Sequence, residues 1–224
     1  SALMNNLANV YRFQGKLNEA FELYKKALAI NPRAPDACNN LGCMFRDKGN
    51  INRAIELHNR AVQIRPEFPE AYNNLGLAYR QNGQFDQALV YFQKALDFKP
   101  DYADAFSNMG LTYKNNEDVS SALSAFEKAI TLDPYNDNFH LNLGNLQREL
   151  GDYEGAITSL LTATELNSKG AESFNSLGVA IFEKGNELEL DKAKAALQTA
   201  ISLDGNFAEP HFNLGNIYHT QANF

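Results

Sequence analysis

A short phrase built around one leucine returns along the whole chain at a nearly constant interval. The first six residues at this position lie 34 apart, and the seventh follows after 37: Leu7, Leu41, Leu75, Met109, Leu143, Leu177 and Leu214. A glycine or an alanine follows each of them. Such a period is typical of solenoids, in which each unit buries its apolar face only against its neighbours. The chain is therefore predicted to be a stack of repeats that binds partners, without a single catalytic pocket.

One repeat, residues 69–102, reads as two helices. Tyr72, Leu75 and Tyr79 are spaced i, i+3 and i+7, which places them on one face of a helix. Gly83 then ends this first helix, as glycine often does after the last helical turn. A second helix follows and stops before the proline near the end of the repeat, because a residue before proline is pushed out of the helical region.

Small residues mark the places where the two helices should approach closely, because larger side chains would hold them apart. In this repeat they are Gly76, Ala88 and Ala95. The two alanine positions recur in every repeat: Ala20, Ala54, Ala88, Ala122, Ala156 and Ala193, then Ala27, Ala61, Ala95, Ala129, Ala163 and Ala200. A closing proline recurs in four repeats: Pro32, Pro66, Pro100 and Pro134.

These residues resemble the tetratricopeptide repeat, whose pattern is an aromatic, Leu-Gly, Tyr, Ala, an aromatic, Ala and Pro at fixed offsets. The resemblance covers the whole chain. It implies an all-α fold, an α-solenoid of helix pairs forming a right-handed superhelix, with thirteen helices and no strand. We expect a single array of six full repeats and the first helix of a seventh, at about 1–34, 35–68, 69–102, 103–136, 137–170, 171–207 and 208–224. No polar capping helix ends it, so a fragment of a longer protein is expected.

Three departures from the pattern are predicted to change the structure locally. Glu117 stands in repeat four where the other repeats place the glycine between their helices. Gln147 replaces an expected aromatic in repeat five, and repeat six carries three extra residues within the segment 185–191. We therefore expect repeats five and six to be the least regular in their stacking.

Asparagine recurs on the side of the first helices opposite their apolar face, the side that lines the concave surface in the family. These residues, the ladder asparagines, are Asn6, Asn40, Asn74, Asn108, Asn142 and Asn213, with Ser176 at this position in repeat six. Asparagine inside a helix costs roughly 0.6 kcal/mol against alanine. One interpretation is that the amides pair with the backbone of a bound peptide, with Asn9 and Asn145 adding polar capacity. The other is that each amide bonds to the neighbouring repeat and sets the stacking angle.

A row of basic residues follows near the end of the first helices, beside the ladder: Arg12, Arg46, Arg80, Lys114 and Arg148. Acidic residues stand at the starts of the same helices, and this arrangement complements the helix dipole without any ligand. The alternative is a basic rail suited to partners that carry acidic side chains or phosphate.

Several classes of function are disfavoured. The net charge of −7 argues against nucleic acid and anionic membranes as main partners. There is no long apolar run, phosphate-binding loop, metal-ligand spacing or nucleophile motif, so we expect no membrane span, metal, cofactor or enzymatic activity. Cys38 and Cys43 are five residues apart on one predicted helix, a poor geometry for a disulfide. A cytoplasmic or nuclear location is expected.

The leading hypothesis is a protein-interaction scaffold that binds an extended peptide in its concave groove through the ladder. The ladder most resembles the repeat arm of the O-linked N-acetylglucosamine transferases. The first alternative is therefore the substrate-recognition arm of such an enzyme, with the catalytic domain outside this chain. The second is an assembly scaffold that self-associates. Capture of a chaperone's C-terminal carboxylate is disfavoured, because Asn5, Asn39 and Asn73 stand where the family members that do so place cations.

Overall fold

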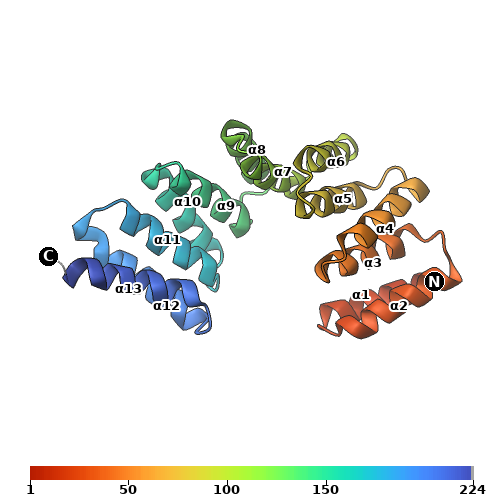
Figure 1. Cartoon of the computed structure of the whole chain (residues 1–224), viewed down its shortest axis with the longest axis horizontal. Coiled ribbons are helices and arrows are strands. Elements are labelled where there is room, and N and C mark those ends of the chain that lie inside the picture. The colour runs from red at the N-terminus through yellow and green to blue at the C-terminus, as the bar shows by residue number, and fades with distance from the viewer. Residues whose placement is uncertain (223–224) are drawn as a thin grey trace. The chain divides into compact units, whose positions relative to one another are not determined.

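The computed structural model describes residues 1–222, which form thirteen α-helices and one short 3₁₀ turn, with no β-strand among them (Figure 1). The prediction of an all-helical tetratricopeptide solenoid is thus confirmed. The chain divides into two compact units, Ser1–Asp118 and Val119–Phe224, which are described separately. The right-handed sense of the superhelix stays a prediction.

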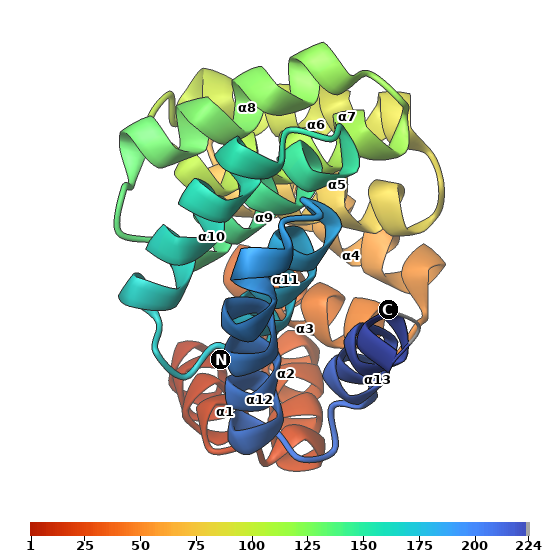
Figure 2. The same cartoon turned by 90° about the vertical axis from the view of Figure 1, so that its left-hand side faces the viewer.

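Unit one contains three helix pairs followed by a single helix. The bounds are α1 Ala2–Phe13, α2 Leu17–Ile30, α3 Pro35–Asp47, α4 Ile51–Ile64, α5 Pro69–Gln81, α6 Phe85–Phe98 and α7 Ala103–Asn115. Unit two begins with one helix, continues with two pairs and ends with a single helix (Figure 2). Its bounds are α8 Val119–Leu132, α9 Asp137–Glu149, α10 Tyr153–Leu166, α11 Ala171–Glu183, η1 Glu187–Glu189, α12 Leu190–Leu203 and α13 Ala208–Ala222.

The helices of each unit pack in two layers. In the five pairs that lie within one unit, the first helix contacts its own second helix, and each second helix contacts the first helix of the next repeat. The first helices also contact one another directly: α3 with α5, α5 with α7, α9 with α11, and α11 with α13. The surface of these helices in each unit is called here the first-helix face. It therefore carries side chains from successive repeats within reach of one another.

Close contact inside four of the helix pairs depends on the glycine that follows the recurring leucine. A Cβ added to Gly76 would lie 2.5 Å from the ring of Phe92 on α6. At Gly144 and Gly178 it would meet Leu160 and Leu197 at 2.6 and 2.7 Å. These distances agree with the predicted role of the small residues, which is to let the two helices approach closely, because a side chain at these positions would clash with the second helix.

The turn between first and second helix needs a left-handed residue. Gly83 adopts φ +73°, and the glycines at 15, 49, 151 and 185 are similar. Glu117 occupies the same place with φ 61°, the one positive φ among the non-glycine residues of the described chain. Backbone bonds confirm that the turn is the same: Glu117 N–H donates to the Lys114 carbonyl at 3.1 Å, and Gly83 N–H to that of Arg80 at 3.0 Å.

The two other departures also have local structural consequences. In the third repeat, Tyr79 and Tyr91 stack with ring centroids 5.1 Å apart. In the fifth repeat the equivalent pair is polar, and the Ser159 hydroxyl donates to Gln147 Oε1 at 2.8 Å. The insertion of repeat six forms the 3₁₀ turn η1, where the Lys184 ammonium donates to Glu189 at 3.0 Å.

The glycine contact generates a matched pair of substitutions. Gly76→Ala must separate α5 from α6 or rotate Phe92, and overpacking of this kind costs about 1–3 kcal/mol. Gly215 is at the equivalent position on α13, where an added Cβ meets nothing within 4 Å. Gly215→Ala should therefore gain the helix propensity of alanine, up to about 1 kcal/mol. Urea unfolding should show a loss for the first variant and none for the second; equal effects would contradict the steric account.

Glu117 generates a second prediction. A left-handed conformation costs an ordinary residue about 1–2 kcal/mol, while glycine costs about 0.4–1 kcal/mol through the unfolded chain. Glu117→Gly should therefore raise the free energy of unfolding by roughly 0.5–1 kcal/mol. The reciprocal control, Gly83→Glu, should lower it. A destabilised Glu117→Gly protein would mean that the glutamate side chain itself supports the turn.

Candidate functional site

Neighbouring repeats are joined on the first-helix face by pairs of asparagines. In each pair a ladder asparagine donates from Nδ2 to the Oδ1 of an asparagine on the preceding first helix. The bonds are Asn40 to Asn5 at 3.1 Å, and Asn74 to Asn39, Asn108 to Asn73 and Asn213 to Asn175 at 3.0 Å each. The accepting residues Asn39, Asn73 and Asn175 are only 6–7% exposed. A buried amide needs such a partner, because an unpaired one costs about 1–3 kcal/mol.

The exception in repeat six follows the same rule. The residue of repeat five that corresponds to these acceptors is Leu141, which is buried and has no oxygen to offer. The ladder position that would face it carries Ser176 in place of asparagine. The amide that donates and the amide that accepts are thus both absent from this pair of repeats. The acceptor role of Asn5, Asn39 and Asn73 was not predicted from the sequence, although these residues recur at the same 34-residue interval as the ladder.

The inter-repeat bonds leave part of the ladder available for a ligand. An asparagine amide has two N–H donors and an acceptor oxygen, and one N–H is used in most of these pairs. Asn74 Oδ1 also accepts from Arg46 at 3.4 Å. Asn9 is already engaged, since its Oδ1 accepts from the Tyr24 hydroxyl at 2.5 Å and from Asn40 at 3.1 Å. Asn6 on α1 is exposed.

The ladder residue Asn142 and its neighbour Asn145 lie half-buried on α9. In unit one the ladder borders an open pocket of about 560 Å³, whose lining includes Asn6, Asn9 and Asn40. Amides of unit one thus face solvent-accessible space as well as the adjacent repeat.

The basic row differs between the two units. Arg148 of α9 donates to both carboxylate oxygens of Glu183 on α11 at 3.0 Å, although its Nε is buried with no partner among the described residues. Arg46 of α3 makes longer contacts, 3.3 Å to Asp47 and 3.4 Å to Asn74. The side chain of Arg80 on α5 makes no hydrogen bond or ion pair with residues 1–222.

Arg80 and Arg46 line one pocket of about 510 Å³ together with Leu77, Gln81, Leu111 and Asn115. Burial lowers the pKa of Arg80, and the positive charge of Arg46 lowers it further. The guanidinium stays charged, because the pKa of arginine lies far above neutral pH. Lys114 is half-buried on α7, and Arg12 is exposed on α1.

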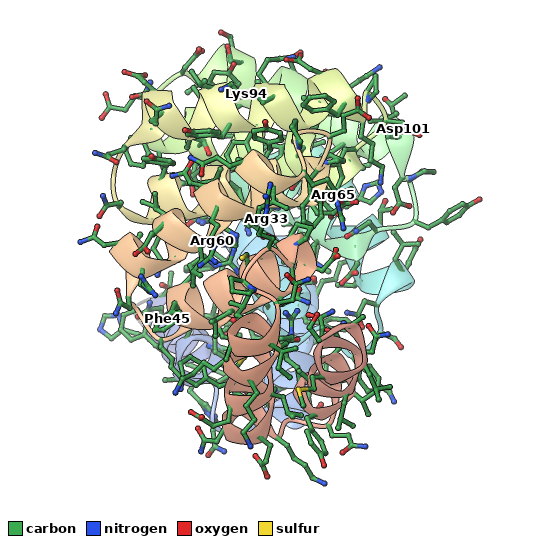
Figure 3. All side chains as sticks on the ribbon, turned by 90° about the vertical axis from the view of Figure 1, so that its right-hand side faces the viewer. Arg33, Phe45, Arg60, Arg65, Lys94 and Asp101 are labelled. Carbon is green, nitrogen blue, oxygen red and sulfur yellow. The ribbon has the colours of Figure 1, made fainter. Side chains whose placement is uncertain are left out.

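The acid at the start of α3 is paired within the protein. The two carboxylate oxygens of Asp36 accept from Arg65 at 2.9 and 2.7 Å. Arg60 and Arg65 are labelled in Figure 3, and Arg60 donates to the Pro32 carbonyl in the loop between α2 and α3. Asp36 therefore completes an ion pair within the protein.

A buried histidine connects the core to the ladder. His58 on α4 is fully buried, and its Nδ1 is 2.9 Å from Asn39 Oδ1, the same oxygen that accepts from Asn74. Since this oxygen can only accept, His58 carries its proton on Nδ1. Burial, and then the charge of Arg46, lower the His58 pKa to about 3.

Within residues 1–222, no three histidine, cysteine, aspartate or glutamate side chains come together as a metal site would require. None of the helices in this range combines the length and apolar character needed to cross a bilayer. Cys38 and Cys43 are buried free thiols, and burial raises the pKa of both.

Family models match most of the chain. A model described as tetratricopeptide repeat matches residues 69–102 and 103–136, and another of the same description matches 125–158. A model described as TPR repeat matches 8–43, 42–83, 144–185 and 189–221. The chain belongs to the tetratricopeptide repeat family. No curated protein sequence matches it significantly.

Solved structures of this class share the fold. A chain of the APC/C hetero-tetramer Cut9-Hcn1 is 20% identical with a TM-score of 0.83, over 96% of this chain and 42% of that one. TTC0263 from Thermus thermophilus is 23% identical with a TM-score of 0.72, over 81% and 98%. YrrB, described as a TPR protein with an unusual peptide-binding site, is 21% identical with a TM-score of 0.59, over 84% and 96%. At these identities the likeness concerns the fold alone.

The low pKa of His58 predicts acid sensitivity. The unfolded chain takes up a proton near pH 6.5, while the folded chain does so only near pH 3. The stability that depends on neutral His58 is complete above pH 6.5 and is lost as the pH falls toward 3. Between pH 7 and 5 this loss should be about 2 kcal/mol. His58→Phe, which places there the residue found at 92 and 126, should remove it. Urea unfolding at pH 7 and pH 5 gives the loss of unfolding free energy for the wild type and for His58→Phe. The same loss in both proteins would refute the role of His58.

Proposed function

We propose that this protein is an interaction scaffold that binds an extended peptide along its first-helix face, with the ladder asparagines contacting the peptide backbone. The observation that carries the proposal is the double position of these amides. Asn40, Asn74, Asn108 and Asn213 each have one side held by the adjacent repeat. In unit one, Asn6 and Asn40 also border an open pocket of about 560 Å³. An amide held in this way loses little further side-chain freedom when a ligand binds.

The spacing of the repeats suits an extended chain. Packed helices lie about 8–10 Å apart, and an extended peptide advances about 3.3 Å per residue. One ladder asparagine would thus meet about every third residue of the peptide. Since amides recognise backbone N–H and C=O groups, the sequence preference should be loose. A peptide ligand is compatible with the fold, because YrrB is described as having a peptide-binding site.

Two further roles are compatible with the fold. The resemblance of the ladder to the repeat arm of O-linked N-acetylglucosamine transferases suggests a substrate-recognition arm, and this rests on the ladder alone. Self-association is favoured by apolar side chains on the terminal helices, since Phe13 of α1 is 95% exposed and Phe212 of α13 is 69% exposed. We favour peptide binding, because the ladder runs over the successive first helices α3, α5 and α7 of unit one and is not confined to the terminal helix α1.

The test separates the two roles of the amides. A peptide ligand is first selected on the wild-type protein from a random library. Asn74→Ala removes an inter-repeat bond and a proposed peptide contact, whereas Asn39→Ala removes the acceptor of that same bond and leaves Asn74 in place. Asn74→Ala should lose about 0.5–1.5 kcal/mol of stability. Asn39→Ala should lose more, because it also leaves the buried His58 Nδ1–H without its acceptor. Only Asn74→Ala should also weaken peptide binding by roughly 0.5–1.5 kcal/mol, or about 2- to 12-fold in Kd.

Calorimetric titration at a temperature where every variant is folded measures the effect. The selected peptide should tolerate alanine at most of its positions but lose affinity when single backbone nitrogens are methylated. If both variants bind equally well, the ladder serves only to stack the repeats, and the groove proposal is wrong.

A further inference from the structure

The pocket at the C-terminal ends of α3, α5 and α7 contains two guanidinium groups, those of Arg46 and Arg80. Both side chains are half-buried. Burial lowers the pKa of Arg80, and repulsion from the charge of Arg46 lowers it further. Arg46 reaches only Asp47, an exposed carboxylate 3.3 Å away, and an amide oxygen. Arg80 reaches no acceptor among residues 1–222. This pair therefore holds charge that the described protein leaves largely unbalanced.

Unit two shows how the same repeat position is balanced. Arg148 is paired with Glu183, which lies 35 residues later on the next first helix. In unit one, the residues 35 positions after Arg46 and Arg80 are Gln81 and Asn115. Both are neutral amides, and both line the pocket. The carboxylate that completes the ion pair in unit two is thus absent at two successive repeats in unit one.

The helix dipole does not explain this difference. The C-terminal end of each helix carries about half a negative charge, which favours arginine in the last turn. That partial charge is equally present at the end of α9, where Arg148 still has its glutamate. The dipole therefore accounts for the arginines but not for the missing counter-ions.

We infer that this pocket binds an acidic side chain of a partner peptide, with the carboxylate paired to Arg80 and Arg46. Arginine forms bidentate bonds with carboxylates, and such charge-assisted bonds are strengthened where water is partly excluded. Leu77 and Leu111 supply apolar surface beside the guanidiniums. The preferred ligand is thus an acidic residue adjoining an aliphatic one. The inference refines the proposed function, because it names the chemistry that one part of the same face selects.

The probes are three capped dipeptides: acetyl-Glu-Leu-amide, acetyl-Gln-Leu-amide and acetyl-phosphoserine-Leu-amide. They are titrated into the ¹⁵N-labelled full chain, and the shifts of the Arg80 Nε–H and of the Leu77 and Asn115 amides give Kd. The glutamate probe should bind about tenfold more tightly than the glutamine probe, and added salt should reduce the difference. Arg80→Gln should abolish this preference. Arg148→Gln, the matched control in unit two, should retain it.

Asn115→Glu tests the inference without removing a charge from the pocket. It supplies at Arg80 the carboxylate that Glu183 supplies at Arg148, so the fold should be as stable as the wild type while the glutamate preference is lost. Equal binding of the glutamate and glutamine probes, or a preference that survives in Asn115→Glu, would overturn the inference. So would binding of the phosphoserine probe alone, which would assign the pocket to phosphate. Because a dipeptide scarcely spans the ladder, failure here leaves the Asn74 and Asn39 comparison intact, and the reverse also holds.

Discussion

The close contact of two helices at a single small residue is the constraint on which the rest of this structure depends. Where Gly76 meets the ring of Phe92, there is no room for even one methyl group. This contact brings each second helix close to its first helix, and the repeated pairs then bury an apolar layer that none of them could bury alone. The first helices are left in contact with one another, so one face displays side chains from successive repeats at regular intervals.

Hydrogen bonding on that face follows from the same geometry. Because successive first helices touch, Asn74 reaches Asn39, and Asn108 reaches Asn73. Where the acceptor position is occupied by Leu141, whose side chain cannot accept a hydrogen bond, the ladder position of the next repeat carries Ser176 and not asparagine. His58 donates to the same Asn39 oxygen from inside the core. The same few amide groups thus bond to the neighbouring repeat, to a side chain of the core and, in the proposed function, to a ligand.

Charge on the face is distributed less evenly than the amides. All five residues of the basic row are cationic, but the residues around each one decide whether it is paired within the protein or open to a ligand. Glu183 pairs with Arg148 and so joins two repeats. At the corresponding places in unit one the neutral Gln81 and Asn115 leave Arg46 and Arg80 facing a pocket. Replacing the residue 35 positions after a cation of the basic row can therefore change the ligand preference of one repeat. The fold is kept, because it depends on apolar contacts that this replacement does not alter.

The sequence by itself determined the repeat period, the helical class, the turn position of Glu117 and the identity of the ladder, because these depend on spacing within one repeat or on single residues with strong backbone preferences. It could not determine which atoms meet between repeats. Asn39 and Asn74 lie 35 positions apart, as do Arg148 and Glu183, and the repeat period alone does not show that side chains at this offset meet. The burial of His58 against Asn39 is likewise not visible in the spacing. Only the tertiary structure decided these, because the stacking of helices sets which side chains lie within hydrogen-bonding distance.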